Sequence, residues 1–404
     1  MTARNVKVLA NQWYSDFNRF AGDLYPGRYT FSKCQELAEQ EDEAKRLSSE
    51  KDSKNLVHYY QYPEFHEIAD GIGDSLALTR MAQKLKTKRV SFLAVAFMAQ
   101  TYKMLNPSNR VYITRSTREL GCSLVFGTNH ASIENWRKSN PTGIIISYIN
   151  SDPYTKRLSN YITTSRNTAQ IFVKAIKKNP GCKILFLSDK YLGMVMKINA
   201  LRLLQKEGLT VDPDLIEIYQ EEYNGHHASC YIHEGYGNNA VETAVLNDPE
   251  AELMIHPESE CGCQSLCLVK IEEGTVSPFL STEQMLQRAR ISDSNRFIVA
   301  TEPGMLYALR KAMPDKTFTP VLKPKLTADG QLLGHCKYMK GNTFEGLIRS
   351  LREARIEIII CDNCTNCLIP STPYEDEEVI HIPRKIAELA RLGIEKGCLE
   401  NTQD

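Results

Sequence analysis

Cysteine is the residue type of this sequence that most strongly suggests metal chemistry. The chain has twelve cysteines among 404 residues, and its first thirty residues mix charged and aromatic side chains without the apolar run of a secretion signal. We therefore expect a soluble, cytoplasmic protein, in which cysteines more often bind metals or take part in catalysis than form disulfides. Cys34, Cys182 and Cys398 are interpreted as small buried hydrophobic residues.

Two compact groups of cysteines are candidates for a metal site. The first has the C-x-x-C-x-x-C pattern that resembles the start of a ferredoxin cluster motif and comprises Cys361, Cys364 and Cys367. The three residues that follow contain no fourth cysteine. The second comprises Cys261, Cys263 and Cys267, and it lacks the C-x-x-x-C-x-x-C spacing of radical SAM enzymes because Lys270 stands where the third cysteine belongs. Either group could bind zinc, although neither has the paired knuckles of a structural zinc site.

A third group is dispersed along the chain. Cys122, Cys230 and Cys336 are separated by 108 and 106 residues. This near-equal spacing of about one domain length suggests three similar segments that each contribute one cysteine to a shared centre. With twelve cysteines to choose from, spacing alone leaves all three groups open.

The elements that must position these cysteines alternate between short apolar runs and longer amphipathic segments. This alternation predicts an α/β fold with parallel sheets, whose strands are buried on both faces. The predicted strands are Asn55–Tyr59, Arg89–Val95, Arg110–Thr114, Gly143–Ile149, Lys183–Ser188, Leu215–Tyr219, Glu252–His256, Phe297–Thr301 and Arg355–Ile360. The predicted helices include Glu64–Leu85, Leu280–Arg290, Phe344–Glu353 and a closing helix from Arg384 to Arg391.

Polar side chains stand at or just past the ends of several predicted strands. They are His58 and Tyr60, Tyr148 and Asn150, Asp189, His256 and Glu258, and Thr301 and Glu302. Ligands of open α/β sheets bind outside the carboxyl ends of the strands, and histidine, tyrosine and glutamate are not typical turn residues. These positions therefore predict one or more active-site clefts.

Composition excludes some classes of function. Lys plus Arg and Asp plus Glu both number 49, so the net charge is zero, which argues against broad binding to nucleic acid or to an anionic membrane. The longest apolar stretch, residues 90–99, is about half a membrane span. The charged segment Glu41–Ser53 is interpreted as a solvated face or linker, and the tail after Arg391 as a fraying end.

A series of motifs between Leu56 and Leu351 resembles the quinolinate synthase family. These motifs occur in the family's order, which makes chance agreement remote. They are His58-Tyr-Tyr60-Gln-Tyr-Pro63-Glu64, Gly73-Asp74-Ser75-Leu76, Phe97-Met98-Ala99, Leu105-Asn106-Pro107, Gly121-Cys122-Ser123-Leu124, Tyr148-Ile-Asn150, Thr164-Ser165-Arg-Asn167, Asp189-Lys-Tyr-Leu192-Gly193, Cys230-Tyr-Ile-His233, His256-Pro257-Glu258, Ser281-Thr282-Glu283, Thr301-Glu302-Pro-Gly304 and Cys336-Lys-Tyr-Met339.

The resemblance implies a fold of three pseudo-equivalent three-layer α/β/α lobes with short parallel sheets around a central active-site cleft. The expected division is an N-terminal helical extension, three lobes and a C-terminal segment that packs back on them: 1–54, 55–141, 142–250, 251–350 and 351–404. The implied reaction condenses iminoaspartate with dihydroxyacetone phosphate to quinolinate, phosphate and water in NAD biosynthesis. A supplying L-aspartate oxidase or dehydrogenase is an implied functional partner.

The resemblance also implies one [4Fe–4S] cluster per chain, held by Cys122, Cys230 and Cys336. Three thiolates leave one iron with an open position, where it can act as a Lewis acid. The expected catalytic residues are His58, Tyr60, His233 and Glu258, with Glu258 a base if the cleft raises its pKa. The expected substrate-binding residues are Ser75, Tyr148, Asn150, Ser165, His256, Ser281 and Thr282.

Departures from the family pattern leave alternatives open. A two-residue insertion after His256-Pro257-Glu258 raises the question of whether Glu258 or Glu260 carries the family role, and we favour Glu258 because it keeps the His-Pro-Glu spacing. Lys156 and Arg166 are left unassigned because lysines and arginines are common on protein surfaces. One alternative function is a divergent iron–sulfur dehydratase with a changed substrate. Another is a non-catalytic iron–sulfur or zinc protein that uses the Cys361–Cys367 run.

Overall fold

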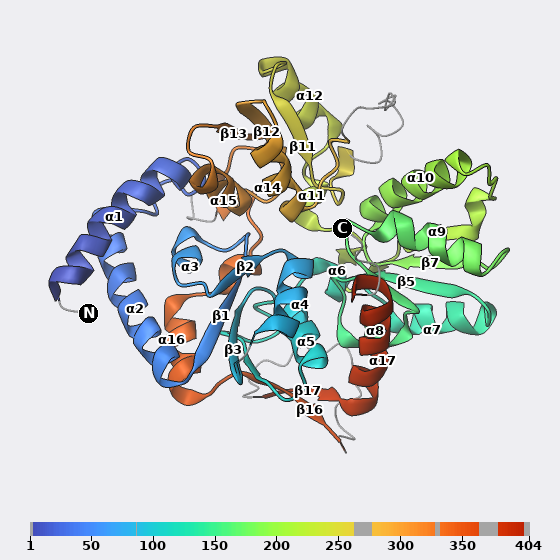
Figure 1. The fold of residues 1–404 in the computed structure, drawn as a ribbon, viewed down its shortest axis with the longest axis horizontal. Helices are drawn as coiled ribbons and strands as arrows, with labels where there is room; N and C mark the ends of the chain where they lie inside the picture. Colours follow the sequence, from blue (N-terminus) through green and yellow to red (C-terminus); the bar gives the residue numbers. More distant parts are fainter. Residues whose placement is uncertain (1–2, 86, 262–276, 328–331, 363–378, 400–404) are drawn as a thin grey trace.

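The computed structural model describes residues 3–85, 87–261, 277–327, 332–362 and 379–399. It is a mixed α/β protein with short, mostly parallel sheets (Figure 1), as the sequence predicts. Each of the nine predicted strands overlaps a strand of the structure. Among the described helices, none is both long and apolar enough to cross a membrane.

The first sheet joins strands from both ends of the chain. Within the described residues its order is β17 (Val379–Pro383), β16 (Glu357–Cys361), β4 (Arg110–Tyr112), β3 (Arg89–Leu93), β1 (Ser53–His58) and β2 (Gly71–Gly73). The pairs from β4 to β2 are parallel, whereas β16 pairs antiparallel with β4. The C-terminal segment therefore extends the sheet that the N-terminal half of the chain begins.

Two smaller sheets follow in the chain, and all their pairs are parallel. One has the order β6 (Tyr161–Thr163), β5 (Ile144–Tyr148), β7 (Ile184–Leu187) and β8 (Ile216–Ile218). The other has the order β11 (Glu252–Ile255), β12 (Arg296–Ala300) and β13 (Thr317–Pro320). Every residue of β5 and β7 is buried, as expected for parallel strands covered on both faces. Short antiparallel pairs are β9 (Glu222–Tyr223) with β10 (His226–His227), and β14 (Lys325–Leu326) with β15 (Leu332–Leu333).

Helices cover the sheets (Figure 1). The helices of the first part of the chain are α1 (Ala3–Ala21), α2 (Phe31–Glu50), α3 (Pro63–Glu67), α4 (Ser75–Lys84), α5 (Ala96–Leu105), α6 (Ser123–Phe126) and α7 (His130–Ser139). Those of the middle part are α8 (Pro153–Leu158), α9 (Thr168–Lys178), α10 (Lys190–Lys206), η1 (Pro213–Leu215), α11 (Tyr231–Glu234) and α12 (Asn238–Asn247). The last are α14 (Thr282–Ile291), α15 (Gly304–Ala312), η2 (Met339–Gly341), α16 (Phe344–Glu353), α17 (Arg384–Ile394) and the π-helical turn η3 (Glu395–Leu399).

The single helix predicted over Glu64–Leu85 is wrong, because β2 interrupts it. A Cβ atom at Gly71 would lie 2.8 Å from Sδ of Met81 and 3.0 Å from Cδ2 of Leu56, so glycine lets β2 pack closely between strand and helix. Asp74 then starts α4, since its side chain accepts a hydrogen bond from the Ala77 N–H at 2.8 Å.

Two interpretations of the chain ends are also wrong. The charged segment Glu41–Ser53 is not a linker: residues 41–50 belong to α2, which buries Glu41 and Leu47 and packs on α1 and α16. The tail does not fray directly after Arg391, because α17 runs to Ile394 along α8 (Figure 1). The thiol of Cys398 is then buried and lies 3.1 Å from the carbonyl oxygen of Ile162.

Candidate functional site

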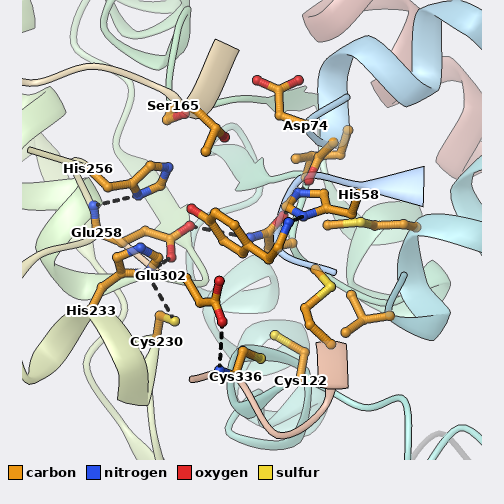
Figure 2. Close-up of a pocket in the computed structure, with 18 of the residues that line it drawn as sticks. His58, Asp74, Cys122, Ser165, Cys230, His233, His256, Glu258, Glu302 and Cys336 are labelled. Atoms are coloured by element: carbon orange, nitrogen blue, oxygen red, sulfur yellow. Dashed lines mark hydrogen bonds and ion pairs between the residues drawn. The ribbon is translucent and has the colours of Figure 1, made fainter. Parts of the chain in front are cut away.

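One pocket collects all fourteen residues that the sequence singles out for catalysis, substrate binding or metal binding (Figure 2). They are His58, Tyr60, Ser75, Cys122, Tyr148, Asn150, Ser165, Cys230, His233, His256, Glu258, Ser281, Thr282 and Cys336. The pocket lining also includes Asp74, Arg166 and Glu302. Glu258 is 3% exposed inside it, whereas Glu260 is not part of the lining.

The pocket lies where strands of three sheets end. His58 is the last residue of β1, Tyr148 is the last of β5, and His256 follows β11 directly. Thr301 and Glu302 follow β12. Because these strands are parallel within their sheets, their carboxyl ends place polar side chains on the same side, which is where α/β sheets bind ligands.

The three pocket cysteines occupy similar local positions. Cys122 immediately precedes α6, Cys230 immediately precedes α11, and Cys336 lies three residues before η2. Each sulfur accepts hydrogen bonds from backbone N–H groups two or three residues further on: from Leu124 and Val125 for Cys122, from His233 for Cys230, and from Tyr338 and Met339 for Cys336. Three chain segments thus present a thiol in the same way.

The chemistry of these thiols fits a metal centre. Burial raises the pKa of all three thiols, to about 12 for Cys122. Repulsion from the Cys336 thiolate raises the pKa of Cys122 further, and repulsion from Glu258 and then from the other two thiolates raises that of Cys230. A bound cation removes that repulsion and deprotonates the thiols. Cys230, His233 and Glu258 also offer ligand atoms that all lie within 4.8 Å of one another.

The other cysteine groups lie apart from the pocket as far as the structure describes them. Cys261 is buried in the hydrophobic core, and Cys361 ends β16. Neither lines the pocket. Cys263, Cys267, Cys364 and Cys367 lie outside the described residues.

A chain of hydrogen bonds crosses the pocket from Ser75 to Tyr60. Ser75 Oγ donates to Asn150 Oδ1 at 3.2 Å, and Asn150 Nδ2 donates to Glu258 Oε1 at 3.3 Å. Oε2 of Glu258 lies 2.8 Å from His233 Nδ1. Nε2 of His233 is 3.0 Å from the hydroxyl oxygen of Thr301, which is 2.7 Å from the hydroxyl of Tyr60. Protonatable groups on three chain segments are thereby connected.

Two of the pocket histidines are neutral. Burial is the main cause that lowers the pKa of His58 and of His256 to about 3. Nδ1 of His58 accepts the backbone N–H of Tyr60 at 3.1 Å, so the proton of this neutral ring resides on Nε2. Nδ1 of His256 accepts the backbone N–H of Glu258 at 3.4 Å in the same way.

Glu258 is ionised at neutral pH. The sequence-based assignment of Glu258 as a base assumed instead that the cleft raises its pKa. Burial alone would raise its pKa, but the contact with His233 at 2.8 Å and the hydrogen bonds that the carboxylate accepts from His233 and Tyr148 outweigh burial and lower it to about 2. The carboxylate is therefore an acceptor at neutral pH, and it is held by its neighbours while it remains unprotonated.

Hydroxyl groups line another part of the pocket. Ser281 is the N-cap of α14, where its Oγ accepts the Gln284 N–H at 3.3 Å, and Thr282 is the first residue of that helix. At α4 the cap is Asp74, so Ser75 is available to Asn150. Ser165 lies just before α9. Hydroxyls and backbone N–H groups at helix starts favour anions.

Sequence reasoning did not assign several residues that shape the site. Thr301 and Glu302 were visible as polar residues after a predicted strand, and so was Asp189, whose Oδ2 accepts the backbone N–H of Cys230 at 3.0 Å.

Lys156 is not a surface charge: it is fully buried, and its ammonium donates to the carbonyls of Ile149, at 2.8 Å, and of Ser151. These two carbonyls flank Asn150.

Arg166 was likewise unassigned. Among the described residues that line the pocket it is the sole arginine or lysine, in a lining that also contains the carboxylates of Asp74, Glu258 and Glu302. Because His58 and His256 are neutral, Arg166 provides the permanent positive charge of this lining. An anionic ligand would need such a charge, since the neighbouring carboxylates repel it.

The sequence of this chain is similar to a protein family and to several known proteins. The family described as Quinolinate synthetase A protein matches residues 42–368. A quinolinate synthase of Pyrobaculum aerophilum is 33% identical over 356 residues, which cover 88% of this chain and 97% of the relative. A quinolinate synthase of Thermus thermophilus is 31% identical, over 87% of this chain and 94% of the relative. One of Prosthecochloris aestuarii is 33% identical, over 79% of this chain and 88% of the relative. The range matched by the family contains all three pocket cysteines.

Proposed function

Since this chain belongs to the quinolinate synthetase A family, we propose that it is a quinolinate synthase of NAD biosynthesis. The proposed reaction, a transferase reaction, condenses iminoaspartate with dihydroxyacetone phosphate to quinolinate, phosphate and water. The observation that carries the proposal is that three thiols and the acid–base residues, from segments far apart in the chain, line one pocket. An L-aspartate oxidase or dehydrogenase is the proposed source of the unstable imine.

Cys122, Cys230 and Cys336 are the residues that would hold a [4Fe–4S] cluster in this proposal. Three protein thiolates leave one iron open, and that iron supplies a Lewis acid for a substrate hydroxyl or carboxylate when the cluster is bound. The similar hydrogen bonds from backbone N–H groups to the three sulfurs support this assignment. We also propose that the lobes 55–141, 142–250 and 251–350 each supply one of these cysteines.

Glu258 is our candidate for the base that removes a proton from the carbon next to the imine. It is buried and unprotonated at neutral pH, as a base must be, although its lowered pKa makes it a weaker base than an exposed glutamate. Asn150 and His233 lie within hydrogen-bond distance of its carboxylate. His233 and Asn150 hold the carboxylate in one orientation, which a general base requires. Tyr148 lies against the same carboxylate and is the proposed contact of a substrate carboxylate or imine.

Tyr60 and His58 are our candidates for proton donation to a leaving hydroxyl. The hydroxyl of Tyr60 is connected through Thr301 to His233, and Nε2 of neutral His58 carries a proton. Burial raises the pKa of Tyr60 well above its usual value, so its hydroxyl keeps the proton that it would donate.

The two substrates carry carboxylates and a phosphate, and the pocket offers matching groups. Ser75, Ser165, Ser281 and Thr282 supply hydroxyls, and His256 supplies an Nε2–H donor. Arg166 adds a permanent positive charge. Hydrogen bonds from charged donors are the strong ones for such anions.

The test is an anaerobic assay of the purified, cluster-loaded protein. Iminoaspartate is generated in the cuvette from aspartate and an oxidised nicotinamide cofactor by an added L-aspartate dehydrogenase, dihydroxyacetone phosphate is supplied, and quinolinate is measured by mass spectrometry. We expect quinolinate from the wild type and a loss of about 100-fold or more in Glu258→Gln, which keeps the shape but removes the base. A loaded cluster without quinolinate would instead identify a divergent dehydratase with another substrate.

A further inference from the structure

The turn between α1 and α2, residues 22–30, lies against the part of the chain that carries Cys336. We call it the N-terminal turn. Leu24 and Tyr25 are buried, with 0% and 1% of their surface exposed. Arg310 of α15 donates to the carbonyl of Phe20, at the end of α1, at 3.0 Å and to Asp23 of the turn at 2.6 Å. The turn precedes residue 42, where the family match begins.

His335, the neighbour of Cys336, connects this turn to the pocket. Its Nε2 lies 2.9 Å from the carbonyl oxygen of Leu24, and its Nδ1 lies 2.9 Å from Oε1 of Glu302. The ring of Tyr25 stacks on the His335 ring with centroids 4.7 Å apart. The orientation of His335 is thus determined by two segments that lie far apart in the chain.

Glu302 carries the connection to the cysteine itself. Its Oε1 accepts the backbone N–H of Cys336 at 3.3 Å, and its Oε2 accepts the N–H of Gly304 at 2.6 Å. A Cβ atom at Gly304 would lie 2.6 Å from that Oε2 and 2.9 Å from the Lys340 ammonium. The carboxylate therefore has little freedom to move.

Lys340 makes a second connection to the same turn. Its ammonium is 3.2 Å from Oε1 of Glu302 and donates to the hydroxyl of Tyr25 at 3.0 Å and to the carbonyl of Tyr60. The side chain is only 7% exposed. A buried ammonium needs its acceptors, because water does not replace them there. Loss of the Tyr25 hydroxyl would remove one hydrogen-bond acceptor from the Lys340 ammonium.

We propose that the N-terminal turn is a positioning element of the metal centre, in which Tyr25, through His335 and Lys340, holds Cys336, Glu302 and Tyr60 in place. The inference rests on the proposed cluster and goes beyond the residues assigned to it. Groups that orient metal ligands typically change metal affinity by about 10–100-fold when they are removed. Tyr25 acts through its neighbours and is not a catalytic residue.

The experiment compares two buried tyrosines of the same turn. Tyr25→Phe keeps the stacked ring and removes the hydroxyl that faces Lys340. Tyr29→Phe is the matched control, since the Tyr29 hydroxyl donates instead to Glu64 at 2.7 Å and lies outside the pocket. Both full-length proteins are reconstituted anaerobically, and the rate of iron release to a ferrous chelator, the iron content and the melting temperature are measured.

We expect Tyr25→Phe to release iron about tenfold faster than the wild type, while Tyr29→Phe releases it at the wild-type rate. Tyr25→Leu, which also removes the stacked ring, should release iron faster still. Equal release from wild type and Tyr25→Phe would overturn the inference, and so would equal acceleration in both tyrosine variants, because the effect would then be general destabilisation. A wild type that binds no cluster would refute the proposed function instead.

Discussion

Oε2 of Glu258 lies 2.8 Å from Nδ1 of His233, and both side chains are almost completely buried. The same nitrogen is 3.2 Å from the sulfur of Cys230. One histidine therefore contacts both the proposed base and a proposed cluster ligand. Figure 2 shows that His233 and Cys230 come from one segment and Glu258 from another. A change in the position of Cys230 should consequently also shift His233 and Glu258.

The assignment of the three cysteines predicts a selective loss of the cluster. Cys122→Ala, Cys230→Ala and Cys336→Ala should each lose most of the roughly four irons per chain because each removes one of three thiolates. Cys182→Ala is the control, since Cys182 lies outside the pocket, and it should keep wild-type iron and sulfide. Iron and acid-labile sulfide are counted after anaerobic purification. A cluster that survives in Cys336→Ala and disappears in Cys364→Ala would move the site to the Cys361–Cys367 run.

Thr301 is predicted to be needed for proton transfer between His233 and Tyr60. Thr301→Val keeps the shape of the side chain and removes the hydroxyl that lies 2.7 Å from Tyr60 and 3.0 Å from His233. We expect kcat to fall by about 100-fold with KM and iron content unchanged. Thr301→Ser should restore most of kcat. A Thr301→Val enzyme with wild-type kcat would exclude this route.

Arg166 is predicted to contribute to the binding of the anionic substrates. Arg166→Gln should raise KM for at least one substrate by about tenfold and leave kcat nearly unchanged, because the lost interaction is with bound charge and not with reacting atoms. Arg157→Gln is a suitable control: Arg157 pairs with Glu134 at 2.8 Å and lies outside the pocket. KM and kcat are measured by steady-state kinetics for both substrates in the two variants. An unchanged KM for both substrates in Arg166→Gln would count against a role of Arg166 in substrate binding.

His58 is predicted to make the fold sensitive to acid. Its pKa is lowered to about 3, mainly by burial, whereas an exposed histidine titrates near 6.5. Between these values the unfolded chain holds one proton more than the folded chain, so stability falls as the pH drops from 6.5 towards 3. The contribution of His58 between pH 7.5 and 5.5 is about 1.4 kcal/mol.

The measurement is denaturant unfolding of the cluster-free protein at both pH values. His58→Asn, which keeps an acceptor for the Tyr60 N–H, should lose about 1.4 kcal/mol less than the wild type over this interval. His381→Asn, on the exposed side of β17, serves as the control with wild-type behaviour. An identical loss in His58→Asn and in the wild type would contradict the prediction.

Much of the fold class and of the pocket could be read from local patterns. Buried parallel strands are continuous apolar runs, so Ile144–Tyr148 and Ile184–Leu187 were recognisable without any partner. Polar residues at the ends of such runs must gather at one edge of a sheet. The resemblance of the local motifs then selected Cys122, Cys230 and Cys336 among twelve cysteines.

The rest depended on contacts between segments that are distant in the chain. No local pattern shows that β16 pairs antiparallel with β4, that Lys156 is buried, or that Glu258 is ionised because His233 and Tyr148 contact its carboxylate. The contact of His335 with Leu24 joins residues whose separation exceeds three hundred positions. Periodicity reports which face of a segment is buried, but the partner of a side chain and its charge state are set by whatever the folded chain packs against that face.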